Sequence, residues 1–166
     1  STHINHTVPW WPLYRNLGDY IHRASEILRR GRPVAEVAVY LPQADIYADN
    51  MLSELHLAMR LEEHLGRADM DAIQKAGYWF DYINDEALCQ LGEIADGKLT
   101  IGENGYRAIL LVGCNRLSVE TARKLRDFAR CGGILICDHV PGESCGLLGR
   151  EEMAEEVRRL MAEAAP

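Results

Sequence analysis

The first regular pattern along the chain is helical and lies near its N-terminus. Apolar side chains recur there every three or four residues, which places them on one face of a helix; they are Leu13, Leu17, Tyr20, Ile21, Ala24, Ile27 and Leu28. Pro12 suits the first turn of such a helix, and Gly31 and Pro33 are typical of its end. The pattern predicts an amphipathic helix between Pro12 and Gly31.

Four later segments are short, apolar and rich in residues that favour β-strands. They are "VAEVAVYLP" (34–42), "YWFDYI" (78–83), "YRAILLVG" (106–113) and "ILICD" (134–138). Runs that are apolar at almost every position suit strands covered on both faces, as in a parallel sheet. We therefore predict four strands.

Helical patterns separate and follow these strands, at residues 50–65, 69–76, 85–91, 118–131 and 150–164. Asp96-Gly97 lies within residues 94–101 and predicts a tight hairpin inserted at an edge. Strands separated by helices pair in parallel through right-handed crossovers. We therefore predict one α/β domain over residues 13–166, a three-layer α/β/α sandwich around a mostly parallel sheet of about four strands, flavodoxin-like in plan.

Composition limits the classes of partner. The chain has 166 residues, is 48% hydrophobic and carries a formal charge of −7, which disfavours nucleic acids and anionic membrane surfaces. No apolar run approaches the ~20 residues of a transmembrane helix, and no signal peptide is visible. Its five cysteines form no CxxC pair, so we expect reduced thiols, a cytoplasmic protein and no metal site.

Ligands of parallel sheets collect at the carboxyl ends of the strands. The loop after the first predicted strand, "LPQADIYADN" (41–50), contains no glycine. A phosphate-binding loop needs glycine so that backbone N–H groups can approach the anion, and no Walker pattern occurs elsewhere. We therefore expect no nucleotide and no other cofactor.

A cysteine and a histidine also follow predicted strands. Cys114 comes directly after the third strand and His139 after the fourth. A thiol on a sharp turn beside a histidine is the arrangement of thiol hydrolases of the glutamine-amidotransferase type. In the alternative interpretation Cys114 is a small turn residue and His139 a solvated one, which the bulky Asn115-Arg116 pair after the cysteine favours.

Three acidic residues gather around the second predicted strand, and they are Asp81, Asp85 and Glu86. Paired carboxylates can serve glycoside hydrolysis. A helix starting at this point explains two of them better, because Asp85 can cap it and Glu86 suits its first turn. Asp81 alternates with Phe80 and Tyr82, which indicates the less buried face of the sheet.

The N-terminal stretch "STHINHTVPWWPLY" is rich in side chains that can bind sugars. His3, Asn5 and His6 could donate hydrogen bonds to hydroxyl groups, and Trp10 and Trp11 could stack on sugar rings. Alternatively, the two tryptophans pack the N-terminal segment against the first helix.

Several stretches resemble a segment of the large bacterial α-L-rhamnosidases (glycoside hydrolase family 106) and related glycoside hydrolases. The first spans residues 2–42, and its matching residues are Thr2, His3, Trp10, Trp11, Tyr20, Arg23, Gly31, Val34, Ala35 and Val37. "AGYWFDYINDEAL" (76–88), "DGKLTIGENGYRAILLVG" (96–113) and "LRDFARCGGILICDHVP" (125–141) are similar to that family as well.

This resemblance implies that the catalytic carboxylates lie in a preceding (β/α)-barrel. Residues 1–12 would continue from that missing domain, with His3, Asn5 and His6 close to the sugar site. Residues 13–166 would form an accessory domain similar to the class I glutamine-amidotransferase-like domain of some β-galactosidases. The resemblance therefore implies a non-catalytic domain that supports the barrel and could border the carbohydrate site; whether the chain also forms a homo-oligomer stays open.

Two further functions remain as alternatives. One is a self-sufficient thiol hydrolase that uses Cys114 and His139. The other is a non-enzymatic interaction domain in which Trp10 and Trp11 pack on a partner protein.

Overall fold

A computed structural model describes residues 5–48, 65–146 and 149–164 of the chain. The chain forms two compact units, Ser1–Pro33 and Val34–Pro166, which are described separately. The predicted boundary at residue 12 concerns a further domain outside this chain, so it stays a prediction. The predicted helix over residues 50–65 lies outside the described residues except for Leu65.

The first unit contains the predicted amphipathic helix. This helix, α1 (Trp11–Leu28), has Pro12 in its first turn, where a missing backbone N–H costs no helical hydrogen bond. The ring of Trp11 stacks on that of Tyr14, with centroids 5.5 Å apart and planes 4° apart. The ring of Trp10 is tilted against that of Tyr14, with centroids 6.1 Å apart. The tryptophans thus pack onto the first turns of α1.

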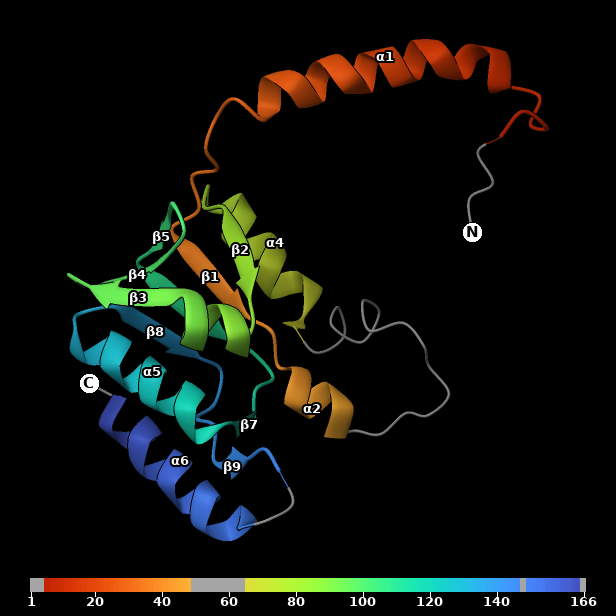
Figure 1. Ribbon diagram of the computed structural model, residues 1–166. Helices are drawn as coiled ribbons and strands as arrows, with labels where there is room; N and C mark the ends of the chain where they lie inside the picture. Colours follow the sequence, from red (N-terminus) through yellow and green to blue (C-terminus); the bar gives the residue numbers. More distant parts are fainter. Residues whose placement is uncertain (1–4, 49–64, 147–148, 165–166) are drawn as a thin grey trace. The chain divides into compact units, whose positions relative to one another are not determined.

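The second unit is built on a four-stranded parallel sheet (Figure 1). Its strands are β1 (Val37–Tyr40), β2 (Phe80–Ile83), β6 (Ala108–Leu111) and β8 (Ile134–Cys137), in the order β2-β1-β6-β8. All neighbouring pairs are parallel, and Val37 lies opposite Phe80 on one side and Ala108 on the other. The predicted α/β class and the parallel sheet are therefore confirmed.

Two hydrophobic cores cover the two faces of this sheet. Val39 and Leu110 point to the face covered by α4 (Arg67–Lys75). Their strand neighbours Ala38, Tyr40, Ile109 and Leu111 point to the opposite face, where α5 (Val119–Arg130) and α6 (Arg150–Ala164) lie. Since successive side chains of a strand alternate between faces, burial on both sides explains why these strands are apolar at every position.

Local sequence signals position α5. The Ser118 hydroxyl accepts a hydrogen bond from the backbone N–H of Thr121 at 3.0 Å, the N-cap that the sequence predicts. Phe128 is fully buried at the other end of the helix. Its ring lies where a side chain on Gly133 would begin, 2.4 Å from an ideal Cβ, so only glycine fits directly before β8.

A smaller antiparallel sheet joins the core on the α5 face, and its strands are β3 (Gly92–Ala95), β4 (Lys98–Ile101) and β5 (Asn104–Tyr106). The predicted hairpin is the β3–β4 turn, in which Asp96 and Gly97 both have positive φ, at 50° and 71°. A π-helix, η1 (Ala87–Leu91), precedes β3 and forms most of the predicted helix over residues 85–91. The predicted strand over residues 106–113 is divided, because Tyr106 ends β5 and β6 begins at Ala108.

The sequence patterns did not reveal three short elements. The predicted loop after β1 contains the helix α2 (Gln43–Ala48). Two dipeptides, β7 (Arg116–Leu117) and β9 (Glu143–Ser144), pair in parallel beyond the main sheet. Each is too short or too polar to produce a periodic pattern. A membrane-spanning helix, which needs a long apolar stretch, is not found among the described helices.

Candidate functional site

The candidate site lies where the carboxyl ends of β1 and β6 meet. From β1 the chain continues to β2 on one side of the sheet and later returns to β6 on the other side. The loops after two such strands diverge and leave a crevice, the usual ligand site of open α/β sheets. In this molecule, side chains from α2 and from the loop after β6 fill that position.

Asp45 of α2 is the central side chain of the crevice and is 2% exposed. Its Oδ2 accepts hydrogen bonds from the backbone N–H groups of Asn115 at 2.9 Å and Arg116 at 3.0 Å. Its Oδ1 accepts a third from Nη1 of Arg116 at 2.9 Å. The charge of this buried carboxylate is thus balanced by one guanidinium and two amide dipoles.

Arg116 carries the network outward to the surface. Its Nη2 lies 3.0 Å from Oε2 of Glu143, which also accepts a hydrogen bond from Arg150 at 2.7 Å. The hydrogen bond from Arg150 and the charge of Arg116 lower the pKa of Glu143 below its ordinary value. Glu143 therefore stays ionised at neutral pH and holds the outer side of the Arg116 guanidinium.

A second polar network surrounds Asp85. Its Oδ1 accepts hydrogen bonds from the Tyr40 hydroxyl at 2.9 Å and from the Thr121 hydroxyl. Ser118 in turn donates to Oγ1 of Thr121 at 2.9 Å. Burial, followed by the negative charge of Asp85, raises the pKa of Tyr40, so its phenol remains protonated and acts as a donor.

The structure assigns the helix cap to a different residue from the one predicted. Oδ1 of Asn84 accepts the backbone N–H of Ala87 at 2.9 Å, so Asn84 caps the turn that leads into η1. The prediction of Asp85 as the cap is therefore wrong. Asn84 and Asp85 are both good capping residues, and only the distant partners of Asp85, Tyr40 and Thr121, decide between them.

The acidic residues around β2 are held by different partners. Asp81 accepts hydrogen bonds from the Tyr106 hydroxyl at 3.0 Å and from Nδ2 of Asn104 at 3.4 Å, which ties β2 to β5. Asp85 faces Tyr40 and Thr121 instead, and Glu86 is exposed. The contacts of Asp81 and Asp85 thus serve to join elements of the fold.

Cys114 and His139 lie at strand ends, as predicted, but they do not form a catalytic pair. Cys114 is fully buried, and burial together with the charge of Asp45 raises the pKa of its thiol. A thiol that stays protonated is a weak nucleophile. In the part of the chain that the structure describes, no hydrogen bond joins the two residues, because Sγ of Cys114 contacts the carbonyl oxygen of Arg116. The thiol-hydrolase alternative therefore finds no support.

His139 is held by its neighbour Asp138 instead. Nδ1 of His139 lies 2.9 Å from Oδ1 of Asp138, whose Oδ2 accepts the backbone N–H of Gly113 at 3.0 Å. Although partial burial opposes it, the hydrogen bonds from Gly113 and His139 lower the pKa of Asp138. Nε2 of His139 is buried and has no hydrogen-bond partner among the described residues. Asp138 thus links the loop after β8 to the loop after β6.

The N-terminal candidates belong to the other unit. His3 lies outside the described residues, and His6 is exposed. Oδ1 of Asn5 accepts hydrogen bonds from the backbone N–H and the hydroxyl of Thr7, at 2.9 and 2.6 Å, so this oxygen is engaged in a local turn. Contact of these three residues with a sugar stays a prediction.

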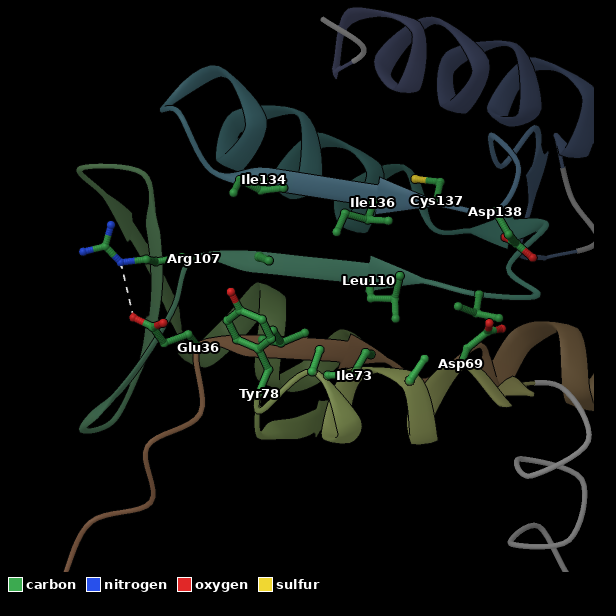
Figure 2. A pocket seen from close by; sticks show the side chains of 15 residues that line it. Glu36, Asp69, Ile73, Tyr78, Arg107, Leu110, Ile134, Ile136, Cys137 and Asp138 are labelled. Carbon is green, nitrogen blue, oxygen red and sulfur yellow. Dashed lines mark ion pairs between the residues drawn. The ribbon is translucent and has the colours of Figure 1, made fainter. Parts of the chain in front are cut away.

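An apolar groove that sequence reasoning missed runs along the α4 face of the sheet (Figure 2). Its volume is about 760 Å³, and its apolar wall includes Ile73, Leu110, Ile134 and Ile136. An ion pair between Glu36 and Arg107, 3.5 Å apart, lies among the lining residues. Helix α4 packs on Val39 of β1 and Leu110 of β6, whereas Ile134 of the edge strand β8 is 57% exposed, and the groove lies along this edge.

A metal centre is not apparent among the described residues, since no group of three or more His, Cys, Asp or Glu side chains is arranged to hold an ion.

Comparison with known proteins gives a consistent family assignment. Residues 1–164 match the glycoside hydrolase family 106, described as alpha-L-rhamnosidase. A protein of Formosa agariphila named "Putative beta-glucuronidase" is 26% identical over 161 residues, which are 96% of this chain and 12% of that protein.

Two solved structures are also similar. A rhamnosidase from Novosphingobium sp. PP1Y has a TM-score of 0.60 and 24% identity over 98% of this chain and 14% of its own. A beta-galactosidase from Bifidobacterium adolescentis has a TM-score of 0.43 and 21% identity over 66% of this chain and 43% of its own, a level that does not establish a shared fold. The chain thus spans about an eighth of the length of the first relatives, 12% and 14%.

Proposed function

Since the chain belongs to the alpha-L-rhamnosidase family of glycoside hydrolases, we infer that it is a non-catalytic accessory domain of such an enzyme. Its role is to support a catalytic barrel supplied by a longer polypeptide, and its N-terminal unit borders the carbohydrate site there. The small share of its relatives that the chain spans, 12% and 14%, supports this reading.

One observation carries the proposal that the domain is non-catalytic. The strand-end crevice, where an α/β domain of this kind would hold a substrate, is filled by its own hydrogen-bonded side chains. Asp45 and Asp85 each accept hydrogen bonds from residues of the fold itself, and the thiol of Cys114 is buried. These groups stabilise the loops and are not presented to a ligand.

The strand order supports a flavodoxin-like assignment for this domain. Counted along the chain, the four strands of the main sheet are arranged 2-1-3-4, with α4 and α5 on opposite faces. The flavodoxin-like order is 2-1-3-4-5, so this sheet corresponds to its first four strands. The amidotransferase-like assignment is part of the same proposal.

An activity assay on the chain alone tests the proposal. We expect release of nitrophenol from a nitrophenyl α-L-rhamnoside to equal the rate in buffer. Turnover clearly above the rate in buffer would show that the chain contains its own reaction centre and would contradict the proposal.

A second assay uses the longer enzyme. In that protein, Asp85→Asn should leave kcat/KM within about twofold of the parent value at 25 °C, because the hydrogen-bond partners of Asp85 in the described part of the chain are Tyr40 and Thr121, which belong to the fold itself. The Asp85→Asn substitution should instead lower the Tm of the enzyme, because it weakens the hydrogen bonds from Tyr40 and Thr121. A loss in kcat of the order of a thousandfold, without a change in Tm, would place Asp85 in the catalytic machinery and contradict the proposal.

A further inference from the structure

The loop after β6 directs several hydrogen-bond donors to one point. The backbone N–H groups of Asn115 and Arg116 and the Nη1 of Arg116 all lie 2.9–3.0 Å from carboxylate oxygens of one residue, Asp45. Two amides and a guanidinium arranged in this way are the donors that proteins use to bind carboxylate or phosphate groups. The position is also the strand-end crevice, where such ligands bind in open α/β sheets.

The ligand of these donors comes from a distant part of the sequence. Asp45 lies in α2, 70 and 71 residues before Asn115 and Arg116. Its side chain enters the donor set from the segment after β1 and is 2% exposed. The donors and their anion thus belong to two segments that this contact holds together.

Contacts that do not involve Asp45 keep the donors in place. The carbonyl oxygen of Asn115 accepts the backbone N–H groups of Gly142 at 3.2 Å and Glu143 at 3.0 Å. Arg116 pairs with Glu143 in the β7–β9 ladder, and its guanidinium is held from the outer side by the Glu143 carboxylate. The N–H of Gly113 binds Asp138. The loop is therefore shaped by β9 and β8, and not only by its anion.

From this arrangement we propose that Asn115 and Arg116, in the loop after β6, form a carboxylate-binding site whose resident ligand is the Asp45 side chain. The site is preorganised, so it takes a small monocarboxylate when that side chain is removed. In the intact protein the Asp45 side chain fills the crevice and holds α2 against the loop after β6.

Chemical rescue tests this proposal. Asp45→Ala removes a carboxylate the size of one formate ion. We expect it to lower Tm by about 10 °C, since it leaves Nη1 of the partly buried Arg116 and two backbone N–H groups without their acceptor. Formate at about 0.5 M should restore about 3 °C relative to the same concentration of chloride, if it binds with a dissociation constant of about 0.1 M. Asp45→Gly leaves more room and should respond to acetate in the same way.

Two control variants separate site binding from general salt effects. Asp71→Ala removes an exposed carboxylate of α4 and should show no difference between formate and chloride. Asp45→Asn keeps the site filled with an amide whose oxygen can still accept both N–H groups, so it should lose less Tm than Asp45→Ala and should not respond to formate.

The outcomes are decisive in both directions. Equal effects of formate on Asp45→Ala, Asp45→Asn and Asp71→Ala, or no effect on any of them, would overturn the proposal. If Asp45→Ala is unfolded in chloride, formate must restore its far-UV circular dichroism; failure to do so would also refute a preorganised site.

Discussion

At the scale of single residues, burial determines the chemistry that each polar side chain can perform. Tyr40 is 1% exposed and donates its hydroxyl hydrogen to Asp85. Cys114 is equally inaccessible, and burial raises the pKa of its thiol. Both groups therefore remain protonated and serve packing and hydrogen bonding in place of acid–base or nucleophilic catalysis.

Tyr40→Phe tests the contribution of the hydroxyl group. The substitution keeps the ring in the core but leaves Asp85 with one donor fewer, so we expect the free energy of unfolding to fall by about 1–2 kcal/mol. Urea denaturation measures this change. Tyr47→Phe is the matched control, because Tyr47 is exposed and its substitution should change the free energy by less than about 0.5 kcal/mol. Equal effects of both substitutions would contradict the assigned role of the Tyr40 hydroxyl.

The rates of thiol alkylation provide a second test at this scale. Iodoacetamide at pH 7.5 should label the exposed Cys131 first and the buried Cys114 last, with labelled peptides quantified by mass spectrometry. Burial raises the pKa of Cys145 to about 11, so its thiolate is also scarce at this pH and its labelling should be slow. Preferential labelling of Cys114 would instead indicate an activated nucleophile and revive the thiol-hydrolase alternative.

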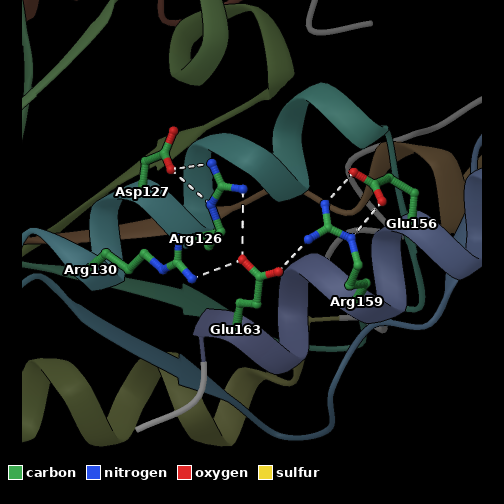
Figure 3. A network of polar contacts seen from close by, with 6 residues as sticks. All are labelled: Arg126, Asp127, Arg130, Glu156, Arg159 and Glu163. Carbon is green, nitrogen blue, oxygen red and sulfur yellow. Dashed lines mark hydrogen bonds and ion pairs between the residues drawn. The ribbon is translucent and has the colours of Figure 1, made fainter.

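At the scale of elements, α5 and α6 are joined by ion pairs as well as by their apolar faces (Figure 3). Glu163 of α6 lies 2.9 Å from Arg130 and 3.8 Å from Arg126, both of α5, and it also contacts Arg159 of its own helix. Three cations around one carboxylate that is 27% exposed form a network, which stabilises more than isolated surface pairs do.

Glu163→Gln should therefore destabilise the α5–α6 pair. We expect a loss of about 0.5–1 kcal/mol at low ionic strength, and screening should reduce this loss in about 1 M NaCl. Glu151→Gln is the control, because Glu151 contacts only Arg158 in the described ion pairs and is 84% exposed. If Glu163→Gln lowered the free energy of unfolding equally at low and high salt, the charge of Glu163 would not be the source of its stabilising effect.

The junction between α5 and β8 allows a test of packing. In Gly133→Ala the new methyl group would overlap the ring of Phe128, which is fully buried and cannot move aside. Overpacking of this kind costs about 1–3 kcal/mol, which thermal or urea unfolding would detect. Gly105→Ala, whose Cβ would approach no atom closer than 3.9 Å, should be tolerated. A neutral Gly133→Ala would contradict the packing described for this turn.

At the scale of the whole molecule, both hydrophobic cores consist of residues after Val34. A chain of residues 34–166 should therefore retain a cooperative unfolding transition, monitored by circular dichroism in urea. A gradual loss of signal without a transition would mean that the second unit needs residues 1–33 to fold.

The sequence predicted those features of the molecule that depend on local patterns. The apolar runs identified the four strands of the sheet, and Ser118 and Asp96-Gly97 identified a cap and a turn, because each of these signals is complete within a few residues. The strand ends were also correctly chosen as the place where Cys114 and His139 would lie. The role of Asp45 was missed because its partners lie 70 and 71 residues away, and no periodicity connects them.

The alternation of β1 between its two cores has a consequence for how this domain tolerates insertions and deletions. Removing one residue within β1 would rotate every later side chain of the strand by half a turn. The phenol of Tyr40 would then enter the α4 side, and Leu41 would take the position from which the phenol binds Asp85. Insertions and deletions among natural relatives of this domain should therefore fall in the loops between strands. The number of residues in each strand of the main sheet should stay constant, so that each side chain keeps its face.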